Sequence, residues 1–103
     1  MRIKKTIVIG RREEVFPFRM LGTEAILIRD SKEVLEILEE LIEKKDEIGL
    51  ILVTRGAASG VLREVEDIAN RIKEPIISII PCGIKEVEPP DMRKLLMRAL
   101  GFG

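Results

Sequence analysis

Four short apolar segments recur along the chain and are separated by longer segments of mixed polarity. They lie at residues 3–9, 25–28, 50–53 and 76–80, and they are rich in isoleucine, valine and leucine. Their apolar residues follow one another instead of alternating with polar ones, which is typical of strands that are covered on both faces. We therefore predict a parallel sheet with crossover helices on both sides.

The connecting segments carry helical patterns. A D-x-x-E capping sequence at residues 30–33 precedes apolar positions that recur on one helical face, and we expect this helix to end near Lys44 and Lys45. Residues 61–72 form a second amphipathic pattern. The first connection, residues 13–20, contains Pro17, which lacks a backbone donor, so its helix is expected to be short or to start late.

This alternation predicts the fold class and the division of the chain. Residues 1–81 should form a single α/β domain, Rossmann-like and receiver-like, with four parallel strands in the order 2-1-3-4 and helices on both faces. Residues 82–90 hold one glycine and two prolines and are expected to form a linker. Residues 91–103 should then form a C-terminal helical tail.

Composition excludes several classes of function. The chain has 103 residues, of which 46% are hydrophobic, and its 18 basic and 18 acidic residues balance. A disordered protein, a nucleic-acid binder or a binder of anionic membranes would show a different balance. No apolar run approaches the roughly 18 residues of a membrane span, so direct membrane insertion is not expected. The lone Cys82 and the absence of an apolar leader indicate the cytoplasm.

The residues that could carry out chemistry are sparse. Open α/β sheets bind ligands beyond the carboxyl ends of their strands, but Gly10 is followed by Arg11 and Arg12 where a dinucleotide site would need further glycines. A receiver domain would need clustered acids there and an aspartate at the position of Thr54. Cys82 has no histidine to activate it, and one cysteine without any histidine leaves only scattered carboxylates as metal ligands. We predict no catalytic residue, no metal and no cofactor.

One loop leaves an alternative open. The sequence TRGAASG at residues 54–60 joins a strand to a helix, and its backbone N–H groups could cradle an anion. The residues concerned would be Thr54, Gly56, Ser59 and Gly60. A tight strand-to-helix turn explains the same small residues, and we favour that interpretation because no Walker-type sequence is present.

Two other segments suggest a protein partner. Phe18, Arg19 and Met20 are of types that are enriched at interfaces, although Phe18 and Leu21 could equally plug the sheet while Arg19 is solvated. The tail carries an apolar stripe with basic residues largely opposite, which favours a second partner over simple docking on its own sheet. The stripe consists of Met92, Leu95, Leu96, Ala99 and Leu100.

These segments resemble the F subunit of the V-type and archaeal A-type rotary ATPases over nearly the whole chain. The likeness lies in the order and spacing of VIG (8–10), PFRMLG (17–22), IGLILVT (48–54), IISIIP (76–81) and RKLLMRALG (93–101). The chain departs from the family pattern at Pro17 and Leu21, where glycine and alanine are usual. It also carries Arg11 and Arg12 where acidic residues often follow the first glycine.

The resemblance implies a non-catalytic component of the central stalk. Such a protein binds the coiled-coil D subunit, turns with it inside the catalytic A/B ring, and helps couple ATP synthesis or hydrolysis to the transport of ions such as the hydrogen ion. Its C-terminal helix would reach the ring as a regulator, and the complex would lie on the cytoplasmic face of the membrane. The expected contact residues are Phe18, Arg19, Met20, Met92, Arg93, Leu95, Leu96, Ala99 and Leu100. The alternative function is a small anion-binding or regulatory module that uses residues 54–60.

Overall fold

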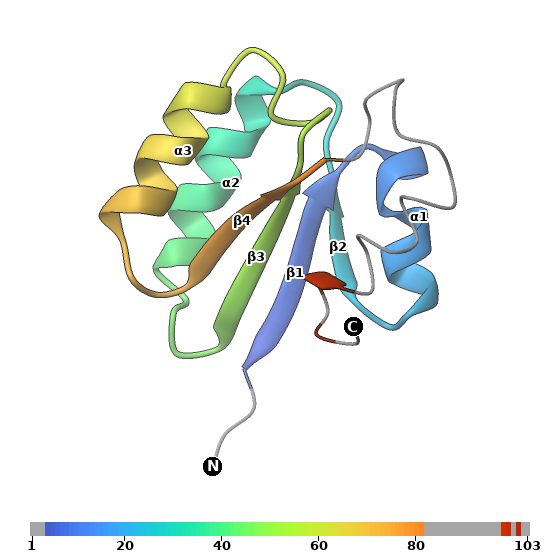
Figure 1. Cartoon of the computed structure of the whole chain (residues 1–103), viewed down its shortest axis with the longest axis horizontal. Coiled ribbons are helices and arrows are strands. Elements are labelled where there is room, and N and C mark those ends of the chain that lie inside the picture. Colours follow the sequence, from blue (N-terminus) through green and yellow to red (C-terminus); the bar gives the residue numbers. More distant parts are fainter. Residues whose placement is uncertain (1–3, 82–97, 100, 102–103) are drawn as a thin grey trace.

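Four parallel strands form one sheet in the order β2-β1-β3-β4, as predicted (Figure 1). The computed structural model describes residues 4–81, 98–99 and 101. The predicted linker and most of the predicted C-terminal helix lie outside these residues. The elements are β1 (Lys5–Gly10), α1 (Arg12–Met20), β2 (Glu24–Leu27), α2 (Lys32–Ile42), β3 (Ile48–Thr54), α3 (Leu62–Arg71) and β4 (Ile76–Ile80). The α/β fold class is therefore confirmed.

The helices cover the two faces of the sheet unequally. Figure 1 shows α2 and α3 side by side on one face and α1 alone on the other. Successive strand residues point to opposite faces, so Ile7 and Ile9 enter the larger cluster under α2 and α3, whereas Val8 enters the smaller cluster under α1. The continuous apolar runs of the sequence thus supply two cores at once.

The two long helices follow their sequence patterns closely. Val34, Leu38 and Leu41 are the buried residues of α2, and the carboxylate of Glu33 accepts the N–H groups of Arg29 and Asp30 at 2.8 and 3.3 Å. The capping sequence therefore closes the start of α2. The helix ends at Ile42, slightly earlier than expected, so the two lysines lie in the turn that follows it.

Helix α1 is short, as Pro17 predicted, but it does not start late. It begins at Arg12 and keeps Pro17 inside its span. At its end, Gly22 adopts a φ of +85°, and the N–H groups of Gly22 and Thr23 donate to the carbonyls of Arg19 and Phe18 at 3.0 and 3.1 Å. This arrangement is a Schellman motif, which needs glycine at the left-handed position. It fixes the end of α1 against the sheet.

Few residues complete the α1 side of the core. The buried side chains there are Val8, Val15, Phe18, Leu52 and Ile80, and partly buried Ala25, Leu50 and Ala99 pack against them. Ala99 belongs to the short helical piece at residues 98–99.

Across the part of the chain that the structure describes, no helix combines the length and apolarity needed to span a membrane.

Candidate interaction surface

The carboxyl edge of the sheet is closed by a buried hydrogen-bond network. At the end of β3, the Thr54 hydroxyl donates to Glu14 Oε1 at 2.9 Å and accepts the N–H of Ala57 at 3.1 Å. Glu14 Oε1 also accepts the N–H of Arg11 at 2.8 Å. Thr54 is fully buried and Glu14 is 5% exposed. The network therefore fills the position at which many α/β proteins hold a ligand.

Gly10 allows this close approach. A Cβ atom at Gly10 would lie 2.7 Å from Thr54 Cγ2 and 3.0 Å from Val15 Cγ1. Only a residue without a side chain lets β1, β3 and α1 meet so closely here. The glycine that follows the first strand thus serves packing, in contrast to the glycines of a dinucleotide-binding loop.

The loop after β3 uses most of its backbone donors internally. The N–H groups of Arg55, Ala58, Ser59 and Val61 donate to protein carbonyls, and that of Ala57 donates to the Thr54 hydroxyl. An anion cradle needs free N–H groups that converge on one point, and the Glu14 carboxylate beside Thr54 would repel an anion. This geometry supports the turn interpretation of residues 54–60.

We expect inorganic phosphate to leave this loop unperturbed. In an amide NMR titration to millimolar phosphate, the signals of Gly56, Ser59 and Gly60 should move no more than those of exposed Glu36 and Glu40 on α2, because the neighbouring loop amides that would have to converge on the anion already have partners and the Glu14 carboxylate would repel it. A saturable shift confined to Gly56, Ser59 and Gly60 would contradict this and restore the anion-binding interpretation.

The remaining candidates for small-molecule chemistry are weak. Within the described ranges, no group of three or more histidine, cysteine, aspartate or glutamate residues could hold a metal ion, and Cys82 lies outside those ranges.

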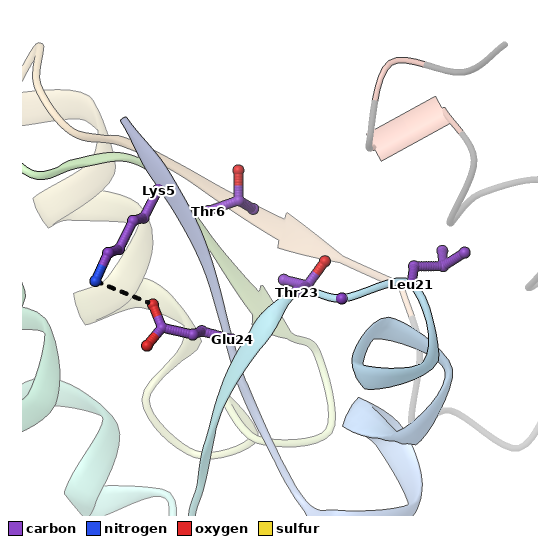
Figure 2. A pocket seen from close by; sticks show the side chains of 6 residues that line it. Lys5, Thr6, Leu21, Thr23 and Glu24 are labelled. Atoms are coloured by element: carbon purple, nitrogen blue, oxygen red, sulfur yellow. Dashed lines mark ion pairs between the residues drawn. The ribbon is translucent and has the colours of Figure 1, made fainter. Parts of the chain in front are cut away.

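One hollow opens beside the end of α1 (Figure 2), lined by Lys5, Thr6, Leu21, Gly22, Thr23 and Glu24. Its ion pair, Lys5 Nζ to Glu24 Oε2 at 3.7 Å, is mostly solvent-exposed on both sides. An open hollow with a solvated ion pair lacks the buried polar groups of a ligand site.

Exposed apolar side chains gather on the α1 side of the molecule. Residue alternation places Ile76 and Leu27 on this face, because their neighbours Ile77 and Ile26 belong to the opposite cluster. The outer positions of α2 and α3 are charged instead, including Glu36, Glu40 and Glu64. The exposed large hydrophobic residues of the described chain are Phe16, Met20, Leu21, Leu27 and Ile76. Such an accumulation on one side is characteristic of a protein-binding surface.

Some of the contact residues predicted from the sequence are exposed in the structure, one is buried, and others lie outside the described residues. Phe18 is only 3% exposed and lies in the core, which corrects its expected role as a surface contact. Arg19 and Met20 are exposed. Leu21, which the alternative interpretation placed in the core with Phe18, is 49% exposed. Of the tail residues, Ala99 packs against the α1-side cluster. Met92, Arg93, Leu95, Leu96 and Leu100 fall outside the described residues.

Sequence reasoning missed Phe16, which is 59% exposed. The sequence holds no signal for this exposure, which follows from the helical phase of α1 in the structure. Buried Val15 and Phe18 lie three residues apart on one face, and Phe16 and Met20 lie four apart on another. Phe16 and Met20 therefore lie on the same exposed face of α1.

The protein-family comparison identifies a relationship over most of this fold. The family model described as ATP synthase (F/14-kDa) subunit matches residues 6–96. The match begins within β1 and extends through β4 into the tail. A comparison with individual curated proteins found no match.

Proposed function

This chain belongs to the ATP synthase (F/14-kDa) subunit family, and on that premise we propose that it is a non-catalytic component of the central stalk of a V-type or archaeal A-type enzyme. The family match confirms the resemblance to the F subunit and makes the chain a component of an ATP synthase complex. The stalk position, the lack of catalysis by the chain itself and the named partners are our proposal.

One contrast within the structure supports a binding role. The carboxyl edge of the sheet, where an α/β enzyme would hold its substrate, is filled by the bond between Glu14 and Thr54. The α1 side instead exposes Phe16, Met20 and Leu21. A fold with a closed ligand edge and an apolar outer surface is suited to holding another protein.

In this proposal the α/β body binds the D subunit, which we call the coiled-coil partner, and turns with it inside the A/B ring. Torque passes between proteins only through a well-packed interface, to which Arg19 and Met20 would contribute from α1. The tail residues Met92, Arg93, Leu95, Leu96, Ala99 and Leu100 would add a second contact, and the C-terminal helix would reach the ring as a regulator. The complex would lie on the cytoplasmic face of the membrane and couple ATP turnover to ion transport.

The direct test is association of the full chain with the coiled-coil partner from the same organism. We expect a stable complex in gel filtration with light scattering and a dissociation constant that calorimetry can measure. The purified chain alone should hydrolyse no ATP. Turnover of ATP by the isolated chain, or no association with the coiled-coil partner, would contradict the proposal.

Removal of the tail gives a second expected result. Deleting residues 92–103 should weaken binding to the coiled-coil partner about tenfold or more, because an apolar helical stripe is lost from the interface. The far-UV circular dichroism of the body should retain its helix and strand signal, since the sheet and its three helices lie within residues 5–80. Unchanged affinity for the coiled-coil partner would count against a role of the tail in binding.

A further inference from the structure

We infer that the outward face of α1 binds a helix of the coiled-coil partner that carries apolar side chains flanked by carboxylates about two helical turns apart. We call this face the α1 stripe, and it consists of Arg12, Phe16, Arg19 and Met20. The inference rests on the proposed function and deepens it by assigning the binding surface and the chemistry of its partner.

The spacing of these residues places them on one side of the helix. Positions i, i+4, i+7 and i+8 share a helical face, and all four are exposed. Glu14, Val15 and Phe18 are the buried residues of the same helix. The stripe is therefore the face of α1 directed away from the sheet.

The apolar part of the stripe is large for a nine-residue helix. Phe16 is 59% exposed and Met20 is 74% exposed. Phenylalanine and methionine are favoured at the centres of interfaces. Burying both side chains against a partner would remove them from water, which supplies the main driving force for association.

Helix α1, which carries the stripe, is fixed at both of its ends in the unbound protein. Its first turn is tied to β3 through Glu14 and Thr54, and its last turn is closed by the motif at Gly22. Figure 2 shows Leu21 and Thr23 where the chain leaves α1 toward β2. A surface that is already ordered loses little conformational entropy on association.

The charges identify the chemistry of the bound helix. Arg12 and Arg19 flank Phe16 and are separated by seven residues, or about 10 Å along a helix. The ion pairs found in the described part of the chain join Lys4 to Glu74 and Lys5 to Glu24, so neither arginine is used in one. Arginine binds carboxylates through two parallel hydrogen bonds. A helix with aspartate or glutamate at a matching spacing would complement both positions.

Two other occupants fit this surface less well. The tail of the same chain carries Arg93, Lys94 and Arg98 but only one acidic residue, Asp91, so its net positive charge would be repelled by Arg12 and Arg19, and Ala99 already packs on the inner cluster. In a symmetric antiparallel pair of α1 helices, Arg12 of one copy would approach Arg19 of the other. A distinct acidic helix avoids both repulsions.

The test compares matched pairs of exposed residues at the same helical spacing. The double variant Phe16→Ser/Met20→Ser should weaken binding of the full-length coiled-coil partner at least thirtyfold in calorimetry. The control Glu36→Ser/Glu40→Ser on α2 should change it less than threefold. The single variant Phe16→Ala, which is milder for the fold, should weaken it at least fivefold.

A charge-reversal variant tests the identity of the partner surface. Arg12→Glu/Arg19→Glu should weaken binding at least tenfold at low salt, and added salt should recover part of the loss, because attraction to carboxylates is replaced by a repulsion that salt screens. Unchanged or tighter binding by this variant would overturn the assignment of an acidic partner helix.

The outcomes separate this inference from the proposed function. If the unaltered chain does not bind the coiled-coil partner, the proposed function fails. If it binds but the Phe16/Met20 variant binds equally well, the proposed function stands and the α1 stripe is overturned as its surface. Sedimentation that shows the chain pairing with itself, with the pairing lost in the same variant, would assign the surface to a second copy and overturn the inference.

Discussion

Replacing Phe18 with alanine is expected to lower the free energy of unfolding by about 3 to 5 kcal/mol, whereas Phe16→Ala should change it by less than about 0.5 kcal/mol. The two residues lie two positions apart on α1, but Phe18 is 3% exposed and Phe16 is 59% exposed. Truncation of Phe18 removes apolar contacts and leaves a cavity beside Val8, Val15 and Leu52. Truncation of Phe16 leaves only water in place of a solvated ring.

Urea unfolding followed by far-UV circular dichroism measures this difference directly and suits a chain without tryptophan or tyrosine. Each variant is the control for the other, because both make the same chemical change in one helix. Similar losses of stability would show that Phe16 is buried in solution and would contradict the surface role of the α1 stripe. Binding to the coiled-coil partner should show the reverse order among the folded proteins, with Phe16→Ala the weaker binder.

The sheet could be predicted from sequence because few topologies satisfy its pattern. Four apolar runs joined by helical segments require right-handed crossovers, and the order 2-1-3-4 places the two longest strands, β1 and β3, next to each other. The apolar faces of α2 and α3 likewise define those helices from local spacing alone. Here the periodicity of the residues and the demands of burial agree.

Residue periodicity alone could not tell which side chains of α1 face the sheet and which face solvent. The segment PFRMLG shows side chains suited to an interface, but composition does not tell which of them faces the sheet. Pro17 also weakened the case for any helix. The structure keeps the helix because Glu14 caps its first turn while bonded to Thr54 of β3, and because Phe18 fills the core. Tertiary contacts, which local spacing does not contain, therefore decide that Phe16 and not Phe18 is exposed.

The closed carboxyl edge was only partly foreseeable. The sequence argued against a dinucleotide site and an activated cysteine, because it lacks the glycine motif and has no histidine. It did not reveal the bond between Glu14 and Thr54, which joins residues 40 positions apart. The bond forms because β1 and β3 are neighbours and because Gly10 has no side chain to separate them. Neither the acid nor the hydroxyl is unusual in its own segment, so the pair becomes visible only once the strands are aligned.

Breaking this pair should have the second large effect on stability. Glu14→Ala should lower the free energy of unfolding by about 2 to 3 kcal/mol, because it removes an N-terminal cap and leaves the buried Thr54 hydroxyl without its acceptor. Thr54→Val should cost about 1 to 2 kcal/mol, since the Ala57 N–H then loses its acceptor as well. Glu14→Gln, whose amide oxygen can still accept, should cost less than Glu14→Ala.

A double-mutant cycle on Glu14 and Thr54 distinguishes a coupled pair from two separate defects. The variant that carries Glu14→Ala and Thr54→Val should be more stable than additivity allows, by about 0.5 to 2 kcal/mol, because the same bond cannot be lost twice. Full additivity in urea unfolding would show that the bond contributes nothing as a pair.

Because this bond anchors the first turn of α1, Glu14→Ala should also weaken binding to the coiled-coil partner while Phe16 and Met20 remain in place. Loss of binding without any change at the α1 stripe would show that the partner recognises an ordered helix, and that the closed edge of the sheet serves to hold that helix still.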